Sequence, residues 1–143
     1  MRKAQISIKR EVAKCAAGHP EIQAAYVFGS AASGRMRPDS DVDVAVLIDG
    51  VKRSGFLKYR LKLMADVGKA LQRNDVDVVI LNEASPLLAH RALSRGDLVF
   101  ERSASARVRF QVRTAARYQD LIPMFETHIR YLKQSVKSGR IIG

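Results

Sequence analysis

The sequence predicts a small α/β (α+β) domain in which a mixed β-sheet is flanked by helices and followed by a helical C-terminal portion. Two runs rich in β-branched residues, 41–48 ("DVDVAVLI") and 75–81 ("DVDVVIL"), are typical of buried strands. Between them, residues 55–73 carry leucine and methionine at helical spacing, which indicates an amphipathic helix. This alternation of strand and helix is typical of the α/β class.

The first forty residues predict one helix, one strand and a connection. Spaced apolar residues near the N-terminus indicate a short helix that is ended by Gly18 and Pro20. Residues 22–28 ("IQAAYVF") predict a strand that ends at Gly29. Residues 31–38 predict a short connection made of one helical turn and a loop.

The second half of the chain predicts three helices and an edge strand. Ser85 is the expected N-cap of a helix that runs to Arg95, with Pro86 in its first turn. Residues 97–101 ("DLVFE") predict a short edge strand. Two further helices are expected at 103–120 and 123–138, and the second carries an apolar stripe that we expect to be buried: Phe125, Ile129, Leu132 and Val136.

Length and composition limit the class of protein. The 143 residues, of which 47% are hydrophobic, are enough for one domain, 1–143, with its own core. A single cysteine excludes a disulfide framework or a thiolate zinc site within the chain. No stretch approaches the roughly 20 apolar residues of a membrane span, and the N-terminus lacks the pattern of a secretion signal. We therefore expect a cytoplasmic protein without a membrane partner.

Two pairs of aspartates stand at the start of the two β-branched runs. Side chains at i and i+2 share one face of a strand, so Asp41 and Asp43 point the same way, as do Asp75 and Asp77. If the strands are neighbours, three or four carboxylates converge and repel one another. A divalent cation would resolve this repulsion, and oxygen ligands of this kind suit Mg²⁺ held together with phosphates. Solvent-facing aspartates at strand ends are the alternative.

A Gly-Ser turn precedes the first aspartate pair. Gly29 allows a close approach of the backbone to a ligand or a positive φ. Ser30 and the amides that follow it, at the start of a helical turn, would face an anion. A Gly-Ser turn followed ten residues later by Asp-x-Asp, with a strand on each side, indicates a phosphate site beside a metal site.

The stretch "GSAASGRMRPDSDVDVAV" resembles the signature of the DNA polymerase β-type nucleotidyltransferase superfamily. In particular it resembles the minimal nucleotidyltransferases (MNT), the MntA-like antitoxins that are paired with a HEPN-domain ribonuclease toxin. The similarity covers a core of about residues 20–101 and includes "DVDVVILNEASPLLAHRAL" and "GDLVFE". It implies the nucleotidyltransferase fold with a helical C-terminal extension, about 103–138.

The resemblance implies a role for each motif residue. Gly29 and Ser30 would hold the triphosphate of ATP, and Asp41, Asp43 and Asp77 would be catalytic residues that bind two Mg²⁺ ions. The acceptor oxygen would attack the α-phosphate beside Asp77, so that AMP is transferred and pyrophosphate is released. Apart from the resemblance, two loop arginines, Arg35 and Arg37, flank the turn and either bind phosphates or are solvated.

The C-terminal portion is strongly basic and short. It contributes six of the eleven net positive charges and is too short for a further domain, so the acceptor must be held largely by a second chain. Because like charges at i, i+4 spacing are unfavourable, the stripe Arg109, Arg113 and Arg117 indicates an anionic partner, although a solvated stripe is possible. An acidic surface of a partner protein is our expectation, and RNA is the alternative.

Three functions remain open from the sequence. The resemblance favours a protein adenylyltransferase that modifies a tyrosine hydroxyl of the toxin, as the antitoxin of a type VII-like toxin–antitoxin pair. A nucleotidyltransferase for a small molecule or an RNA end is the second. A binding protein that neutralises its partner by contact alone is the third.

Overall fold

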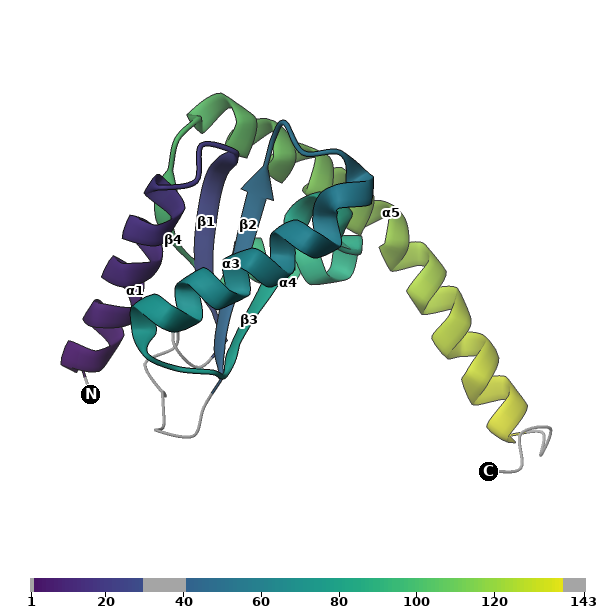
Figure 1. Ribbon diagram of the computed structural model, residues 1–143. Helices are drawn as coiled ribbons and strands as arrows, with labels where there is room; N and C mark the ends of the chain where they lie inside the picture. Colours follow the sequence, from purple (N-terminus) through teal and green to yellow (C-terminus); the bar gives the residue numbers. More distant parts are fainter. Residues whose placement is uncertain (1, 30–40, 138–143) are drawn as a thin grey trace.

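The computed structural model describes residues 2–29 and 41–137, which form one four-stranded sheet with helices on both faces (Figure 1). The strands stand in the order β3-β2-β1-β4. β1 is antiparallel to β2 and β4, and β2 is parallel to β3. Their bounds are Ile22–Phe28 for β1, Val42–Ile48 for β2, Val76–Ile80 for β3 and Asp97–Glu101 for β4.

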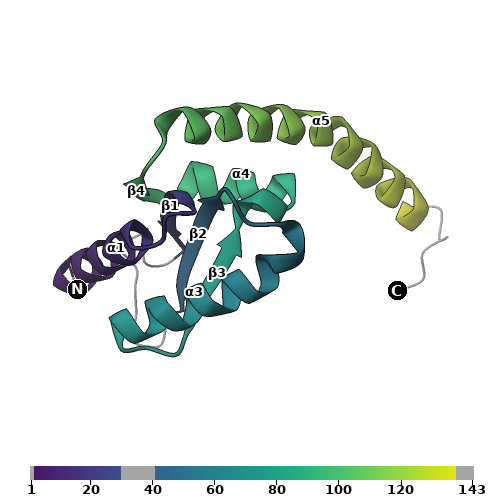
Figure 2. The same cartoon turned by 45° about the horizontal axis from the view of Figure 1, so that its top comes forward.

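Two helices cover each face of the sheet (Figures 1 and 2). α1 (Arg2–Ala17) and α3 (Phe56–Leu71) pack on one face, and α4 (Pro86–Arg95) with the first part of α5 (Ala104–Lys137) packs on the other. Short 3₁₀ turns at Arg53–Gly55 and Leu81–Glu83 follow β2 and β3. The mixed α/β architecture expected from the sequence is therefore confirmed.

The strands are buried on both faces, which is why their sequences are almost continuously apolar. In β2, Val44 contributes to the core under α1 and α3, and Leu47 contributes to the core under α4 and α5. Each predicted strand is present within about one residue of its expected bounds, and β4 is an edge strand as predicted. Ser85 is the N-cap of α4, since its hydroxyl oxygen accepts a hydrogen bond from the Leu88 amide at 3.2 Å.

The C-terminal portion is one helix and not the two helices expected at 103–120 and 123–138. α5 runs without a break from Ala104 to Lys137 and contains Pro123. The prediction was wrong because a proline is a common first residue of a helix. Here its missing amide removes one backbone hydrogen bond within the helix, and α5 bends along its length without ending (Figure 2).

The apolar stripe in the second half of α5 is exposed, which corrects the expectation that it is buried. The exposed fractions are 44% for Phe125, 50% for Ile129, 38% for Leu132 and 63% for Val136. The reason is that α5 extends beyond the sheet and α4, so these residues have no surface of their own domain to pack against (Figure 1). No helix within 2–29 or 41–137 has the length and apolar character needed to cross a membrane.

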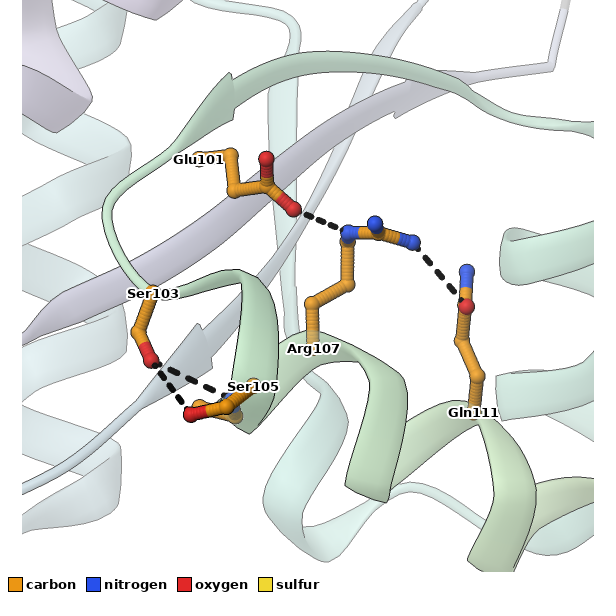
Figure 3. A network of polar contacts seen from close by, with 6 residues as sticks. Glu101, Ser103, Ser105, Arg107 and Gln111 are labelled. Atoms are coloured by element: carbon orange, nitrogen blue, oxygen red, sulfur yellow. Dashed lines mark hydrogen bonds and ion pairs between the residues drawn. The ribbon is translucent and has the colours of Figure 1, made fainter.

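A polar network fixes the first turns of α5 against the end of β4 (Figure 3). The Ser103 hydroxyl oxygen accepts a hydrogen bond from the Ala106 amide at 3.1 Å and caps the helix. Arg107 forms an ion pair with Glu101 and donates a hydrogen bond to the Gln111 side chain at 3.0 Å. The direction in which α5 leaves the sheet is thus set at its N-terminus.

Candidate active site

The register between β2 and β3 places one aspartate of each pair side by side. In this parallel pairing Asp43 is the partner of Asp77, between the partners Val42–Val76 and Val44–Val78. The valines point into the core under α1 and α3, so both aspartates point to the opposite face of the sheet. Asp41 is exposed and lies two residues before Asp43. The structure therefore brings these three predicted residues to one edge of the sheet.

Gly29 lies against the Asp43 carboxylate at the end of β1. Phe28, the preceding residue, is the antiparallel partner of Asp43. Gly29 has a φ of +74°, and a Cβ atom added to it would lie 2.5 Å from Asp43 Oδ2. Glycine is needed here for two reasons, since the backbone is left-handed and the space of a side chain is taken by the carboxylate.

The three aspartates share one electrostatic environment. Burial raises the pKa of the Asp43 carboxyl, and the negative charges of Asp77 and then Asp41 raise it further. Carboxylates that repel one another in a partly desolvated place disfavour the ionised form. A cation that these oxygen ligands can bind would relieve this cost.

Asp75 does not join the cluster. Arg73 donates two hydrogen bonds to its carboxylate, at 2.7 and 2.6 Å, and these bonds lower the pKa of Asp75. The second aspartate pair is therefore divided, with Asp75 held in an ion pair and Asp77 facing Asp43. The assignment of Asp77 as the third site carboxylate fits this geometry.

Arg60 on α3 is a site residue that sequence reasoning missed. Its Nη2 atom donates to Asp77 Oδ1 at 2.9 Å, and its Nε atom donates to the Val78 carbonyl at 2.6 Å. Within residues 2–29 and 41–137, no three acidic, histidine or cysteine side chains are placed to hold a metal ion. With Asp77 paired to Arg60, the carboxylates do not form a ready metal cage. No local pattern identifies Arg60, because it lies seventeen residues before its partner and reads as part of the polar face of a helix.

Other predicted residues lie outside this cluster or outside the described residues. Ser30, Arg35 and Arg37 fall within 30–40, which the structure does not describe. His90 on α4 is partly buried and stacks on Tyr118 with 3.7 Å between ring centroids.

Comparison with known families assigns the class of this site. Residues 10–105 match the family described as "Polymerase beta, Nucleotidyltransferase". This range includes the strand ends that carry Gly29, Asp43 and Asp77. The chain therefore belongs to the polymerase β family of nucleotidyltransferases, and the resemblance found in the sequence is confirmed.

The chain is also similar in sequence to two protein adenylyltransferases. The chain is 31% identical over 106 residues to the protein adenylyltransferase MntA of Shewanella oneidensis, covering 71% of this chain and 70% of the relative. It is 29% identical over 100 residues to the protein adenylyltransferase MntA of Aphanizomenon flos-aquae, covering 66% and 67%.

Solved structures show the same likeness over most of the chain. A crystal structure of a toxin–antitoxin with AMP-PNP matches with a TM-score of 0.72 and 28% identity, covering 87% of this chain and 98% of that chain. A tri-AMPylated Shewanella oneidensis HEPN toxin in complex with MNT antitoxin matches with a TM-score of 0.68 and 26% identity, covering 90% and 98%.

Replacing Gly29 by alanine should separate the two roles of this glycine. Gly50 has a similar φ of +82°, but a Cβ atom there would have no neighbour within 4 Å. Gly29→Ala and Gly50→Ala should each lower the free energy of unfolding by about 1–2 kcal/mol, the cost of a left-handed alanine. Only Gly29→Ala should displace the Asp43 carboxylate and slow nucleotidyl transfer, by about 100-fold. Thermal denaturation and transfer of labelled nucleotide measure both effects, and equal activity of the two variants would contradict the role of the contact.

Asp75→Asn should affect stability and leave nucleotidyl transfer intact. Because Arg73 lowers the pKa of Asp75 in the folded protein, the ion pair stabilises the fold above the ordinary carboxyl pKa of about 3.9. This contribution is lost as the pH falls through the lowered pKa of the folded state. We expect urea denaturation at pH 7 to show a loss of about 0.5–1 kcal/mol, and the difference from wild type should shrink as the pH falls below about 3.9. A variant with full stability and no transfer would instead place Asp75 in the site.

Proposed function

We propose that this protein is a Mg²⁺-dependent adenylyltransferase that transfers AMP from ATP to a hydroxyl group of a partner HEPN-domain ribonuclease toxin, acting as the antitoxin of the pair. The acceptor that we expect is a tyrosine hydroxyl. The observation that carries this proposal is the alignment of Asp43 with Asp77, beside Gly29 and Asp41, at one edge of the sheet. The names of the relatives, protein adenylyltransferases and toxin–antitoxin complexes, support the acceptor class.

In this proposal different residues at the strand ends bind the triphosphate and the metal ion. Gly29 and Ser30 hold the triphosphate, because the left-handed turn at Gly29 lets backbone amides approach phosphate oxygens. Arg35 and Arg37, in the segment between β1 and β2, are candidates for further phosphate contacts. Asp41, Asp43 and Asp77 would hold Mg²⁺, which when bound neutralises phosphate charge and lowers the pKa of an attacking hydroxyl. The donor set fits this ion, since all three ligands are hard carboxylate oxygens.

Arg60 occupies one of the two carboxylate oxygens of Asp77, because its Nη2 atom donates to Oδ1. In this proposal a bound cation would share the Asp77 carboxylate with the Arg60 guanidinium, which neutralises it in the absence of a cation. A cavity of about 370 Å³ adjoins this pair, and Glu83 and Ser85 line it. It lies along the free edge of β3 and offers room for the acceptor side chain next to Asp77.

The second half of α5 offers a surface for the partner protein. On the helix surface, Thr114 and Tyr118 share the face that packs toward α4, and the spacing carries this face on to Phe125, Ile129 and Leu132. The first part of the face is covered, whereas the second part is exposed although it is apolar. Two shallow hollows of about 370 and 580 Å³ lie on different sides of this segment. A helix that is apolar on more than one side requires a partner to cover it, and in this proposal the toxin is that partner.

Asp41→Asn combined with Asp43→Asn should abolish AMP transfer and leave the fold intact. The pKa of Asp43 is raised in the folded protein, so its ionised form at neutral pH costs stability. Removing two negative charges from the cluster should therefore keep or raise the melting temperature in EDTA. The measurements are transfer of label from ATP to the purified partner in Mg²⁺, and thermal denaturation in EDTA.

Asp75→Asn is the matched control for that experiment, because it removes a neighbouring carboxylate outside the cluster. A clear loss of melting temperature in the double variant would show that Asp41 and Asp43 are structural. Unchanged transfer would remove them from the active site.

Ile129→Asp should weaken the complex with the toxin and leave the isolated protein stable. Ile129 is half exposed, so the change should alter the free energy of unfolding by less than about 0.5 kcal/mol. A charge placed in the apolar centre of an interface should cost about 2 kcal/mol or more, roughly a 30-fold weaker complex. Gln134→Asp adds the same charge to an exposed position of the same helix and lines neither hollow. Equal affinities of the two variants in a pull-down titration would exclude this face from the interface.

A further inference from the structure

A polar cavity of about 420 Å³ lies at the end of β2 that is remote from the aspartates. Leu47, Ile48 and Asp49 line one side of it, and the first part of α5 lines the other. Ile48 lies five residues after Asp43 along an extended strand, which is a distance of about 17 Å. The cavity is therefore a separate place on the molecule and not an extension of the catalytic edge.

Four arginines converge on this cavity. Arg109, Arg113 and Arg117 come from three successive turns of α5, and Arg53 comes from the 3₁₀ turn after β2. Among the described residues of the lining, Asp49 is the only acid, and its carboxylate already accepts a hydrogen bond from the Gly50 amide at 2.9 Å. The positive charge of the lining therefore exceeds its negative charge by three.

These arginines are not used by the fold. All four are exposed, and none makes a hydrogen bond or an ion pair to any residue of the described ranges. Three like charges at i, i+4 spacing on one helix destabilise it slightly when they are not compensated. In contrast, the floor of the cavity is fixed, because the Asn82 side chain both accepts from the Ile48 amide at 2.9 Å and donates to the Ile48 carbonyl at 2.8 Å.

We propose that this cavity is a second anion site that binds the phosphate groups of a nucleotide or of an RNA chain, beyond the adenylyl transfer proposed above. Guanidinium groups bind phosphate oxygens in pairs of parallel hydrogen bonds. The α5 arginines follow one another about 6 Å apart along the helix axis, so successive phosphates can each meet one of them. The volume lies in the range of pockets that hold small molecules, about 300–1,000 Å³, and Phe110 provides an apolar wall. A hollow of this kind suits compact phosphates better than the broad acidic surface of a protein.

The test is a binding measurement without Mg²⁺, so that the catalytic carboxylates do not contribute. Fluorescence anisotropy of a labelled single-stranded RNA of about ten nucleotides is measured in EDTA, with unlabelled ATP as competitor. The combined change Arg109→Gln and Arg113→Gln should weaken RNA or ATP binding by about tenfold or more. Lys58→Gln with Lys62→Gln removes the same charge from exposed positions of α3 and should change binding by no more than about twofold. Arg113→Lys, which keeps the charge but loses the paired hydrogen bonds, should fall between wild type and the double variant.

The competitor identifies the source of the phosphates. Displacement of RNA by ATP shows that a single nucleotide fills the cavity, and binding of RNA that ATP does not displace shows that a chain is required. Three results would overturn the proposal: no binding of either probe to the wild-type protein, equal losses in the arginine and lysine variants, or a polyglutamate peptide that binds as tightly as RNA and depends on the same arginines. Melting temperatures of all variants establish that the fold is kept.

Discussion

The parallel register of β2 and β3 is the constraint on which the rest of the site depends. A shift of either strand by one residue would turn its own aspartate into the core and its valines out of it, so that Asp43 and Asp77 would no longer share one face. The buried valines therefore fix the register, and the register fixes the distance between the two carboxylates. Packing energy from one face of the sheet holds together charges that repel one another on the other face.

The protein tolerates this repulsion by local compensation. Arg60 neutralises Asp77, and Arg73 removes Asp75 from the cluster. Among the described residues no positively charged side chain pairs with Asp43, and its raised pKa reflects this. Gly29 leaves the space that the Asp43 carboxylate occupies. The Asp43 carboxylate thus lacks a compensating positive charge in this cluster, and a bound cation would supply one.

Local patterns in the sequence were sufficient to predict the strands, the strand ends at which the aspartates lie and the position of Gly29. β-Branched runs and Asp-x-Asp spacing are short-range signals, and they predict the same edge of the sheet that the structure shows. Arg60 and the arginine-lined cavity could not be predicted, because they arise where α3, α5 and the strands meet in space. The prediction that the apolar stripe in the second half of α5 is buried was wrong for a related reason. An apolar stripe at helical spacing is the same whether its own domain or another protein covers it.

The two ends of β2 lie beside side chains of opposite charge, and this separation determines where anions bind. Without a cation, the cluster of Asp41, Asp43 and Asp77 repels phosphates, so the arginines at the far end are the favourable place for them. A divalent cation at the aspartates reverses this preference, because it converts a repulsive edge into one that attracts a triphosphate. Under the two proposals made above, a protein with a net charge of +11 would keep RNA or spare nucleotides away from its carboxylates and still admit ATP together with a metal ion. The uneven distribution of charge, and not its total, decides where each anion binds.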